Sequence, residues 1–245
     1  MQQFSVLNLP VHIHNNYLNW LEQRLQQQQG THVVTLNAEM AMQSRQNREL
    51  ADVVGQAELV VPDGAGVVLF LRSQGQSVDR CPGIELAESI VQSSAQNQWQ
   101  VFLIGGAEGV TETVAQKWQQ KFEDLAIAGT HHGYFDTSGE QSLCDQLQAS
   151  QPHLILVGLG VPRQELWIKQ HRHLCPQSVW IGVGGSFDIW AGLKTRAPHW
   201  LRDNNLEWVY RLYKEPWRWR RMLALPHFVW CVTWDSLGQK LSKPQ

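Results

Sequence analysis

One carboxylate of the sequence stands where a catalytic base is expected. Asp63 lies in the turn Pro62-Asp63-Gly64, directly after the apolar run Leu59-Val60-Val61. A carboxylate at a strand end can take a proton from a substrate hydroxyl that it reaches within about 3 Å. The alternative is structural, because Asp is also a good N-cap for a helix that follows such a turn. The residues alone leave Asp63 with these two roles, general base or helix cap.

Glycine turns follow other apolar runs and offer binding residues. Gly105-Gly106 and Gly184-Gly185 each stand between such a run and a helical stretch. They either bring the backbone close to a phosphate at a helix N-terminus or serve turns that need positive φ. Gln164 follows the turn Gly158-Leu159-Gly160. Its amide can hydrogen-bond a sugar, and the alternative is a solvated first turn of a helix.

Several cofactor motifs are missing. The sequence has neither a dinucleotide-binding Gly-x-Gly-x-x-Gly after its first strand nor a P-loop, which disfavours an NAD-dependent oxidoreductase. His131-His132 and His171-Arg172-His173 have no metal-binding set beside them, so we interpret them as surface or packing histidines. Because no Asp-x-Asp occurs, we expect no metal clamp on a diphosphate. Arginines and backbone N–H groups would carry the charge of a diphosphate instead.

Buried strands are expected to position these residues. Uncharged runs rich in β-branched residues are typical of strands buried on both faces of a parallel sheet. They predict strands at 33–36, 59–61, 101–104, 154–157 and 179–183, with a weaker candidate at 126–129. Helical periodicity predicts helices over 38–54, 84–94, 110–122 and 141–149. This alternation predicts an α/β fold, whose ligands bind beyond the carboxyl ends of the strands.

Composition excludes several classes of protein. The 245 residues are 43% hydrophobic and 17% charged, enough for the core of one domain with a short appendage. The formal net charge of −2 argues against a general nucleic-acid binder. Four cysteines without CxxC spacing indicate a reducing compartment. We expect no signal peptide, because residues 1–10 lack a basic stretch followed by an apolar one.

The last quarter of the chain has a different composition. Seven of the 12 tryptophans follow residue 189, and residues 196–221 contain seven basic residues but only three acidic ones. We therefore expect an α/β core over 1–196 and a helical appendage over 197–245. Tryptophans with arginines suit an anionic membrane surface; the alternatives are a helix packed on the core and, less favoured, single-stranded nucleic acid. The apolar run 222–234 is too short for a spanning helix of about 20 residues, so it is expected to be buried or interfacial.

Taken together and in order, the motifs resemble the WecG/TagA/CpsF family of bacterial glycosyltransferases, glycosyltransferase family 26. The matching stretches extend over nearly the whole chain. They are Thr35-Leu36-Asn37-Ala38-Glu39, Pro62-Asp63-Gly64-Ala65-Gly66, Arg80-Cys81-Pro82-Gly83, Ile104-Gly105-Gly106, His132-Gly133-Tyr134-Phe135, residues 158–165, residues 182–188, Arg196-Ala197-Pro198, residues 206–212, Glu215-Pro216 and Arg218. The departures are Val161, where a small polar residue is common, and the individual tail after Arg221.

The resemblance implies a Rossmann-like, mostly parallel sheet flanked by helices, and transfer of a sugar from a UDP-sugar donor. The best-described members transfer N-acetylmannosamine, or its uronic acid, to a polyprenyl-diphosphate-linked N-acetylglucosamine. They invert the anomeric centre, need no metal or other cofactor, and can form homo-oligomers. They are peripheral proteins of the inner face of the cytoplasmic membrane, where the C-terminal appendage helps to complete the site.

The resemblance also assigns residues. Asp63 takes the acid-base role, on the acceptor hydroxyl. The candidate substrate-binding residues are Thr35, Asn37, Arg80 and Gln164 in a polar pocket, Asp188, Gly184 and Gly185 for the nucleotide, Arg211, Arg218 and Arg221 for the diphosphate, and Gly105, Gly106, Tyr134 and Gly160 within matching motifs. Two alternatives stay open: a transferase of another UDP-hexose, such as glucose or galactose, in exopolysaccharide synthesis, and a non-catalytic partner of a membrane glycosyltransferase.

Overall fold

A computed structural model describes residues 1–204, 206–219 and 223–241, with side chains at all of these except 218 and 235–241. The strands are β1 (Gln2–Val6), β2 (Leu9–Ile13), β3 (Thr31–Leu36), β4 (Leu59–Pro62), β5 (Val101–Gly105), β6 (Ile127–His131), β7 (Leu154–Gly158) and β8 (Val179–Gly182). The helices of the core are α1 (Tyr17–Gln26), α2 (Ala38–Gln46), α3 (Arg48–Gln56), α4 (Ala65–Ser73), α5 (Gly83–Asn97), α6 (Val110–Lys121), α7 (Thr137–Ser150), α8 (Arg163–His171), η1 (Arg172–Leu174) and α9 (Ser186–Trp190). The C-terminal segment forms α10 (His199–Asp203), α11 (Glu207–Lys214), η2 (Pro216–Arg218) and α13 (Ala224–Leu241).

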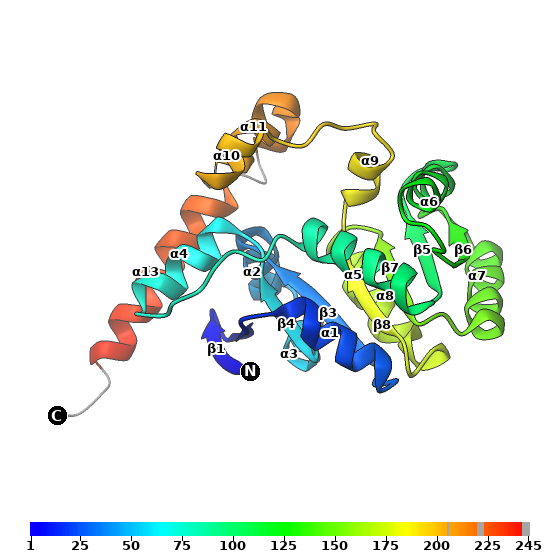
Figure 1. Cartoon of the computed structure of the whole chain (residues 1–245). Helices are drawn as coiled ribbons and strands as arrows, with labels where there is room; N and C mark the ends of the chain where they lie inside the picture. The colour runs from blue at the N-terminus through cyan, green and yellow to red at the C-terminus, as the bar shows by residue number, and fades with distance from the viewer. Residues whose placement is uncertain (205, 220–222, 242–245) are drawn as a thin grey trace.

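Six parallel strands form the central sheet, in the order β4-β3-β8-β7-β5-β6 (Figure 1). All six strands predicted from the apolar runs are present, the weaker one as the edge strand β6. The side chains of α1, α5, α6 and α9 pack on one face of the sheet, and those of α2, α3, α7 and α8 pack on the other. Each fully buried aliphatic side chain in these layers contributes about 1.5–3 kcal/mol. The predicted Rossmann-like α/β fold is therefore confirmed.

Two local features differ from the predictions. The helix predicted over 38–54 is two helices, because Asn47 ends α2 with extended backbone and its side chain accepts the N–H of Leu50 as the N-cap of α3. The antiparallel hairpin β1–β2 was not predicted. Its turn residues Leu7 and Asn8 both have positive φ, 51° and 65°. A two-residue turn of this kind is usually signalled by a glycine, which is lacking here.

The C-terminal helix α13 packs on α2 and α4, at the opposite end of the molecule from β6 (Figure 1). Its residues Phe228, Cys231 and Val232 are buried in the core formed by these helices. Val229, Trp230 and Trp234 on the same helix are exposed. The run predicted at 222–234 is therefore buried on one side and exposed on the other, its first residue lying outside the described part. No helix among the described residues has the length and apolar character needed to cross a bilayer. The four cysteines are free.

Candidate active site

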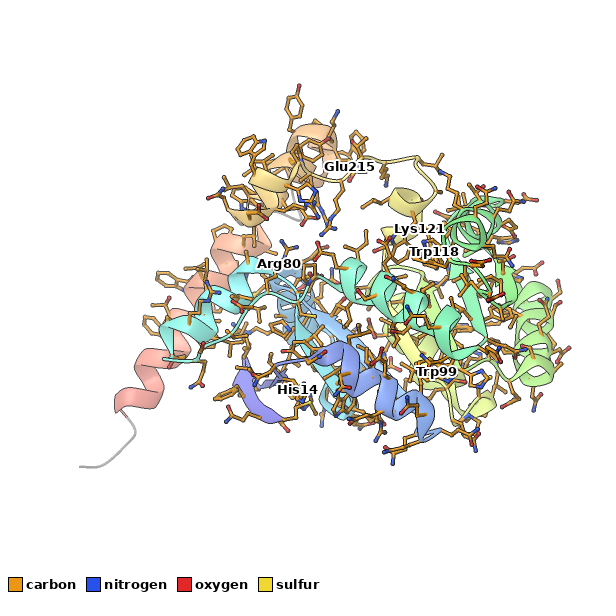
Figure 2. The ribbon with its side chains drawn as sticks, in the orientation of Figure 1. His14, Arg80, Trp99, Trp118, Lys121 and Glu215 are labelled. Carbon is orange, nitrogen blue, oxygen red and sulfur yellow. The ribbon has the colours of Figure 1, made fainter. Side chains whose placement is uncertain are left out.

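A pocket of about 630 Å³ lies beyond the carboxyl ends of β3, β4 and β8. Segments of the core form its floor, and α11 with the chain that follows it forms the opposite wall. Arg80 and Glu215 come from these two sides (Figure 2). The sequence-predicted residues that line it are Thr35, Asn37, Asp63, Arg80, Gly160, Gln164, Gly184, Gly185 and Arg211. The sheet edge thus brings most of the candidate residues together, as expected for an open α/β sheet.

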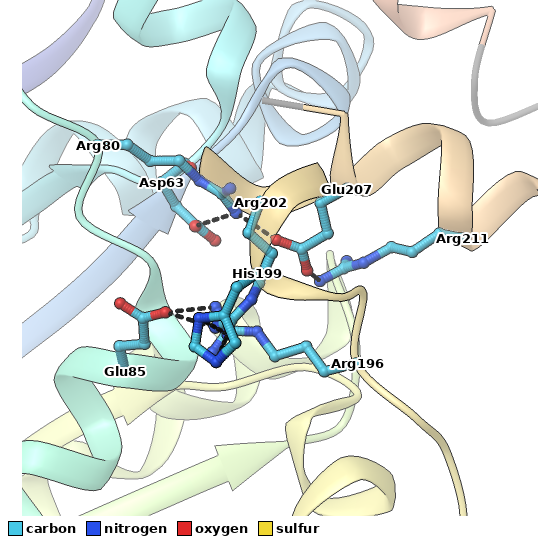
Figure 3. Close-up of polar contacts among 8 residues, drawn as sticks. All are labelled: Asp63, Arg80, Glu85, Arg196, His199, Arg202, Glu207 and Arg211. Atoms are coloured by element: carbon cyan, nitrogen blue, oxygen red, sulfur yellow. Dashed lines mark hydrogen bonds and ion pairs between the residues drawn. The ribbon is translucent and has the colours of Figure 1, made fainter. Parts of the chain in front are cut away.

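Asp63 occupies the turn between β4 and α4. Its backbone N–H donates to the carbonyl of Leu36 at 3.0 Å, and its own carbonyl accepts from Nε of Arg80 at 2.5 Å. The N-cap of α4 is Gly64, and no side chain caps that helix. Asp63 is therefore not a helix cap, and the structural alternative for this residue is wrong. Its carboxylate faces the pocket, with Oδ1 at 3.6 Å from the guanidinium of Arg80 (Figure 3).

The surroundings of Asp63 make it a stronger base than an ordinary aspartate. Burial raises the pKa of its carboxyl, and the nearby Glu207 adds to the increase. Arg80 and Arg211 oppose these effects without cancelling them. A general base works best when its pKa lies near the pH at which the enzyme operates. The raised pKa of Asp63 therefore suits the removal of a proton from a hydroxyl.

Glu207 links the appendage to the core next to Asp63. One of its oxygens accepts from Arg80 at 2.8 Å and the other from Arg211 at 2.6 Å (Figure 3). Only 5% of Glu207 is exposed. Although burial would raise its pKa, Arg211 and Arg80 hold the pKa of Glu207 at about 2. Glu207 is therefore a carboxylate that joins an arginine after β4 to an arginine on α11.

Gln164 belongs to a buried hydrogen-bond network rather than to a solvated turn, so the solvent-facing alternative is wrong. Its Nε2 donates to Glu165 at 2.8 Å, and its Oε1 accepts the backbone N–H of Gly184 at 3.0 Å. The other oxygen of Glu165 lies 2.6 Å from Nε2 of His32 on β3. Both Gln164 and Glu165 are buried. The network fixes the glycine turn after β8 at the pocket wall.

Gly182→Ala is expected to disrupt this network. A Cβ at this position would lie 2.5 Å from Nε2 of Gln164 and 2.5 Å from Oε1 of Glu165. Overpacking of this kind typically costs about 1–3 kcal/mol, so the free energy of unfolding measured in urea should fall by that amount. Gly55→Ala is the matched control, because a Cβ there meets nothing within 4 Å inside α3. It should be neutral or stabilise by about 0.5–1 kcal/mol. Equal stability of the two variants would contradict this role of Gly182.

Thr35 and Asn37 also have structural duties. Asn37 is the N-cap of α2, where its Oδ1 accepts the N–H of Met40 at 2.9 Å. Thr35 is buried against Gly83, the first residue of α5. A Cβ added at Gly83 would lie only 2.6 Å from Cγ2 of Thr35. Both residues line the pocket with their remaining polar atoms. Their roles in substrate binding stay predictions.

Four of the residues predicted from the sequence do not line this pocket. Gly105 and Gly106 have φ of 141° and 69°, and a Cβ on Gly105 would collide with the Gly158 carbonyl at 2.5 Å, so backbone packing explains the first glycine. Tyr134 is 78% exposed in the loop after β6. Asp188 holds Lys194, a lining residue, at 2.8 Å. The side chain of Arg218, and Arg221 as a whole, lie outside the described residues.

Sequence reasoning missed several residues of the pocket. They include Glu39, Lys194, Arg196, Glu207, Tyr210, Lys214 and Trp217. The basic excess over 196–221 pointed to this segment, yet it did not reveal which arginines pair with which carboxylates. Arg80 and Glu207 are 127 positions apart in the chain. Only the folded arrangement brings them together.

Known proteins resemble this chain over most of its length. The model of the glycosyl transferase WecG/TagA/CpsF family matches residues 4–242. Three relatives are named N-acetylglucosaminyldiphosphoundecaprenol N-acetyl-beta-D-mannosaminyltransferase. The one from Bacillus subtilis strain 168 is 32% identical over 100% of this chain and 96% of its own length, the one from Bacillus spizizenii strain W23 is 37% identical over 85% and 80%, and the one from Staphylococcus aureus strain MW2 is 34% identical over 82% and 78%. The resemblance seen in the motifs is thus confirmed, and the chain belongs to the WecG/TagA/CpsF family of glycosyltransferases.

Proposed function

We propose that this protein transfers N-acetylmannosamine from a UDP-sugar to a polyprenyl-diphosphate-linked N-acetylglucosamine during synthesis of a cell-surface polysaccharide. The observation that carries the proposal is the position of Asp63. Its carboxylate does not cap a helix and faces a pocket that Arg80 and Arg211 also line. The choice of sugars is supported by the names of the near-full-length relatives. The pocket therefore combines a base with cations that suit a diphosphate.

The proposed reaction is a single displacement. Asp63 takes the proton of the acceptor hydroxyl, O4 of N-acetylglucosamine by analogy with the family, as that oxygen attacks C1 of the donor sugar. The bond from C1 to the UDP oxygen breaks, so UDP leaves with its electron pair and the anomeric centre is inverted. Arg80, Arg211 and Lys214 at the pocket stabilise the charge that develops on the diphosphate, with no metal in the proposed mechanism. Such preorganised donors typically supply about 3–4 kcal/mol each.

A donor panel tests the proposal. The purified protein is incubated with a synthetic diphospholipid-linked N-acetylglucosamine and, in turn, UDP-N-acetylmannosamine, its uronic acid, UDP-glucose and UDP-galactose. We expect mass spectrometry to detect a lipid product with one added N-acetylmannosamine. If only UDP-glucose or only UDP-galactose gives a product, that sugar is the donor and the proposal of N-acetylmannosamine is wrong. The absence of any product, together with stimulation of a membrane glycosyltransferase by the added protein, would favour the non-catalytic alternative.

We further propose that the protein is peripheral at the inner face of the cytoplasmic membrane and attaches through its appendage. Large apolar side chains are exposed there on α10, α11, η2 and α13. They include Trp200, Trp208, Tyr213, Trp217, Val229, Trp230 and Trp234, with Trp219 directly after η2. Arg211 and Lys214 stand among them, and such a mixture favours an anionic lipid surface. A surface of this kind next to the pocket would present a lipid-linked acceptor to Asp63, and the free cysteines are consistent with a reducing compartment.

Removal of two of these aromatic rings should weaken membrane attachment. Trp230 and Trp234 are 66% and 67% exposed and stack on each other at 6.0 Å. The double variant Trp230→Gln/Trp234→Gln is expected to bind vesicles of anionic phospholipid about tenfold more weakly, because two interfacial rings are lost. Cosedimentation without substrate measures the effect. Tyr134→Gln, an exposed aromatic residue at the other end of the sheet, is the control and should bind like the wild type. Equal binding of the double variant and the wild type would refute attachment through α13.

A further inference from the structure

A second group of charged residues lies beside the pocket, apart from the pairs made by Glu207. Arg196, at the end of the core, and Arg202, in the appendage, both contact Glu85 of α5, and His199 lies against Arg202 (Figure 3). A single oxygen of Glu85, Oε1, accepts from Arg196 at 2.7 Å and from Arg202 at 3.1 Å. Arg202 also lies 2.7 Å from Nδ1 of His199. Arg196 lines the same pocket as Asp63.

These arginines have donors that nothing in the described structure accepts. The Nε atoms of Arg196 and Arg202 are buried and lack a hydrogen-bond partner among the described residues. Buried N–H groups are rarely left unpaired in proteins. Two guanidinium groups share one carboxylate, so the cluster keeps a net positive charge. Both features indicate a missing anion with more acceptor oxygens than Glu85 offers.

The two arginines of this cluster are mostly buried, whereas the carboxylate of Glu85 is half exposed and can turn toward solvent. The side chains of Arg196 and Arg202 are 18% and 16% exposed, but that of Glu85 is 50% exposed. Glu85 lies in the first turn of α5, where backbone N–H groups also favour negative charge. A phosphate group presents several oxygens and matches the planar fork of a guanidinium. It can therefore take the place that Glu85 occupies.

We infer that Arg196, Arg202 and His199 form a phosphate-binding subsite for a substrate diphosphate, and that Glu85 occupies it until the substrate binds. This inference rests on the proposed function, in which both the UDP-sugar and the lipid-linked acceptor contain a diphosphate. The subsite differs from Arg211, Arg218 and Arg221, the residues to which the family resemblance assigns the diphosphate. A ligand phosphate at Arg196 lies within the same pocket as the Asp63 carboxylate.

The first test uses Arg202→Gln. Calorimetry measures the Kd of UDP and of inorganic pyrophosphate, and steady-state assays measure the KM of the lipid-linked acceptor. A rise of about tenfold or more in the Kd of UDP assigns the subsite to the donor, and the same rise in the acceptor KM alone assigns it to the acceptor. If all three values match the wild type, the inference is wrong. Arg172→Gln is the control, because this arginine pairs with Glu58 away from the pocket.

The second test uses Glu85→Gln and predicts an effect of opposite sign. Because the variant removes the competing carboxylate, pyrophosphate should bind several-fold more tightly than to the wild type. If Glu85 served only to hold the arginines in place, the variant would bind pyrophosphate equally or more weakly, and that result would overturn the inference. Pyrophosphate binding needs no turnover, so this measurement stands even if no donor sugar is transferred. A wild type that fails to bind pyrophosphate would also overturn the inference.

Discussion

Asp63→Asn is expected to lower kcat by about 10²–10⁴-fold, the range that a positioned general base contributes. The amide keeps the size of the carboxylate but cannot accept the proton of the acceptor hydroxyl. Because the change acts on the transition state, the Kd of UDP should change by no more than about twofold. UDP release gives kcat, and calorimetry gives the Kd of UDP. Asp145→Asn on the exposed face of α7 is the matched control and should retain full activity.

The pH dependence gives an independent check on Asp63. Since the base must be ionised, kcat/KM should rise with pH through the pKa of Asp63, which burial places above the usual value of 3.8. This acidic limb should disappear in Asp63→Asn. Retention of both the limb and wild-type turnover in the variant would show that another group is the base.

Glu207→Gln is expected to reduce kcat/KM by about 10–100-fold, because Arg80 and Arg211 lose the carboxylate that they share. Loss of this negative charge also lowers the pKa of Asp63, since Glu207 helps to raise it. The acidic limb of the kcat/KM profile should therefore move to lower pH, an effect that simple loosening of the appendage would not produce. A variant with the wild-type profile and rate would contradict this role. Glu207→Asp, which keeps the charge, should recover part of the loss.

Glu207 also stabilises the fold. Its pKa of about 2 lies below the ordinary 4.5, so its contribution is fully present above about pH 4.5 and is lost as the pH falls toward 2. The difference in pKa corresponds to about 3 kcal/mol at neutral pH. Glu207→Gln should lower the free energy of unfolding in urea at pH 7 by up to this amount. No change in stability would mean that the two arginines find other partners.

The sheet and part of the site could be predicted from the sequence for a simple physical reason. Strands buried on both faces need unbroken apolar runs, and residues that follow them must meet at one edge of a parallel sheet. Asp63, Asn37 and Gly184 follow three such runs, and all three line the pocket. A glycine alone was a weaker signal, because Gly105 allows close packing of the backbone against Gly158.

Other features depend on contacts that no local pattern encodes. The break at Asn47 interrupts a helical periodicity that looks continuous in the sequence. Glu207 and Arg211 form an i,i+4 pair within α11. Only the folded arrangement adds Arg80 to Glu207 and brings Arg196 and Arg202 to Glu85. The family resemblance assigned a role to Arg211 but none to these acidic partners, whose charges decide how the arginines are arranged.

The central claim is that this chain transfers N-acetylmannosamine to a lipid-linked acceptor. The most direct test is UDP release from UDP-N-acetylmannosamine by the purified protein, with and without synthetic diphospholipid-linked N-acetylglucosamine, and with Asp63→Asn measured in parallel. We expect release only when both substrates are present and only with an intact Asp63. No acceptor-dependent release by the wild type, or equal release by the variant, would contradict the claim.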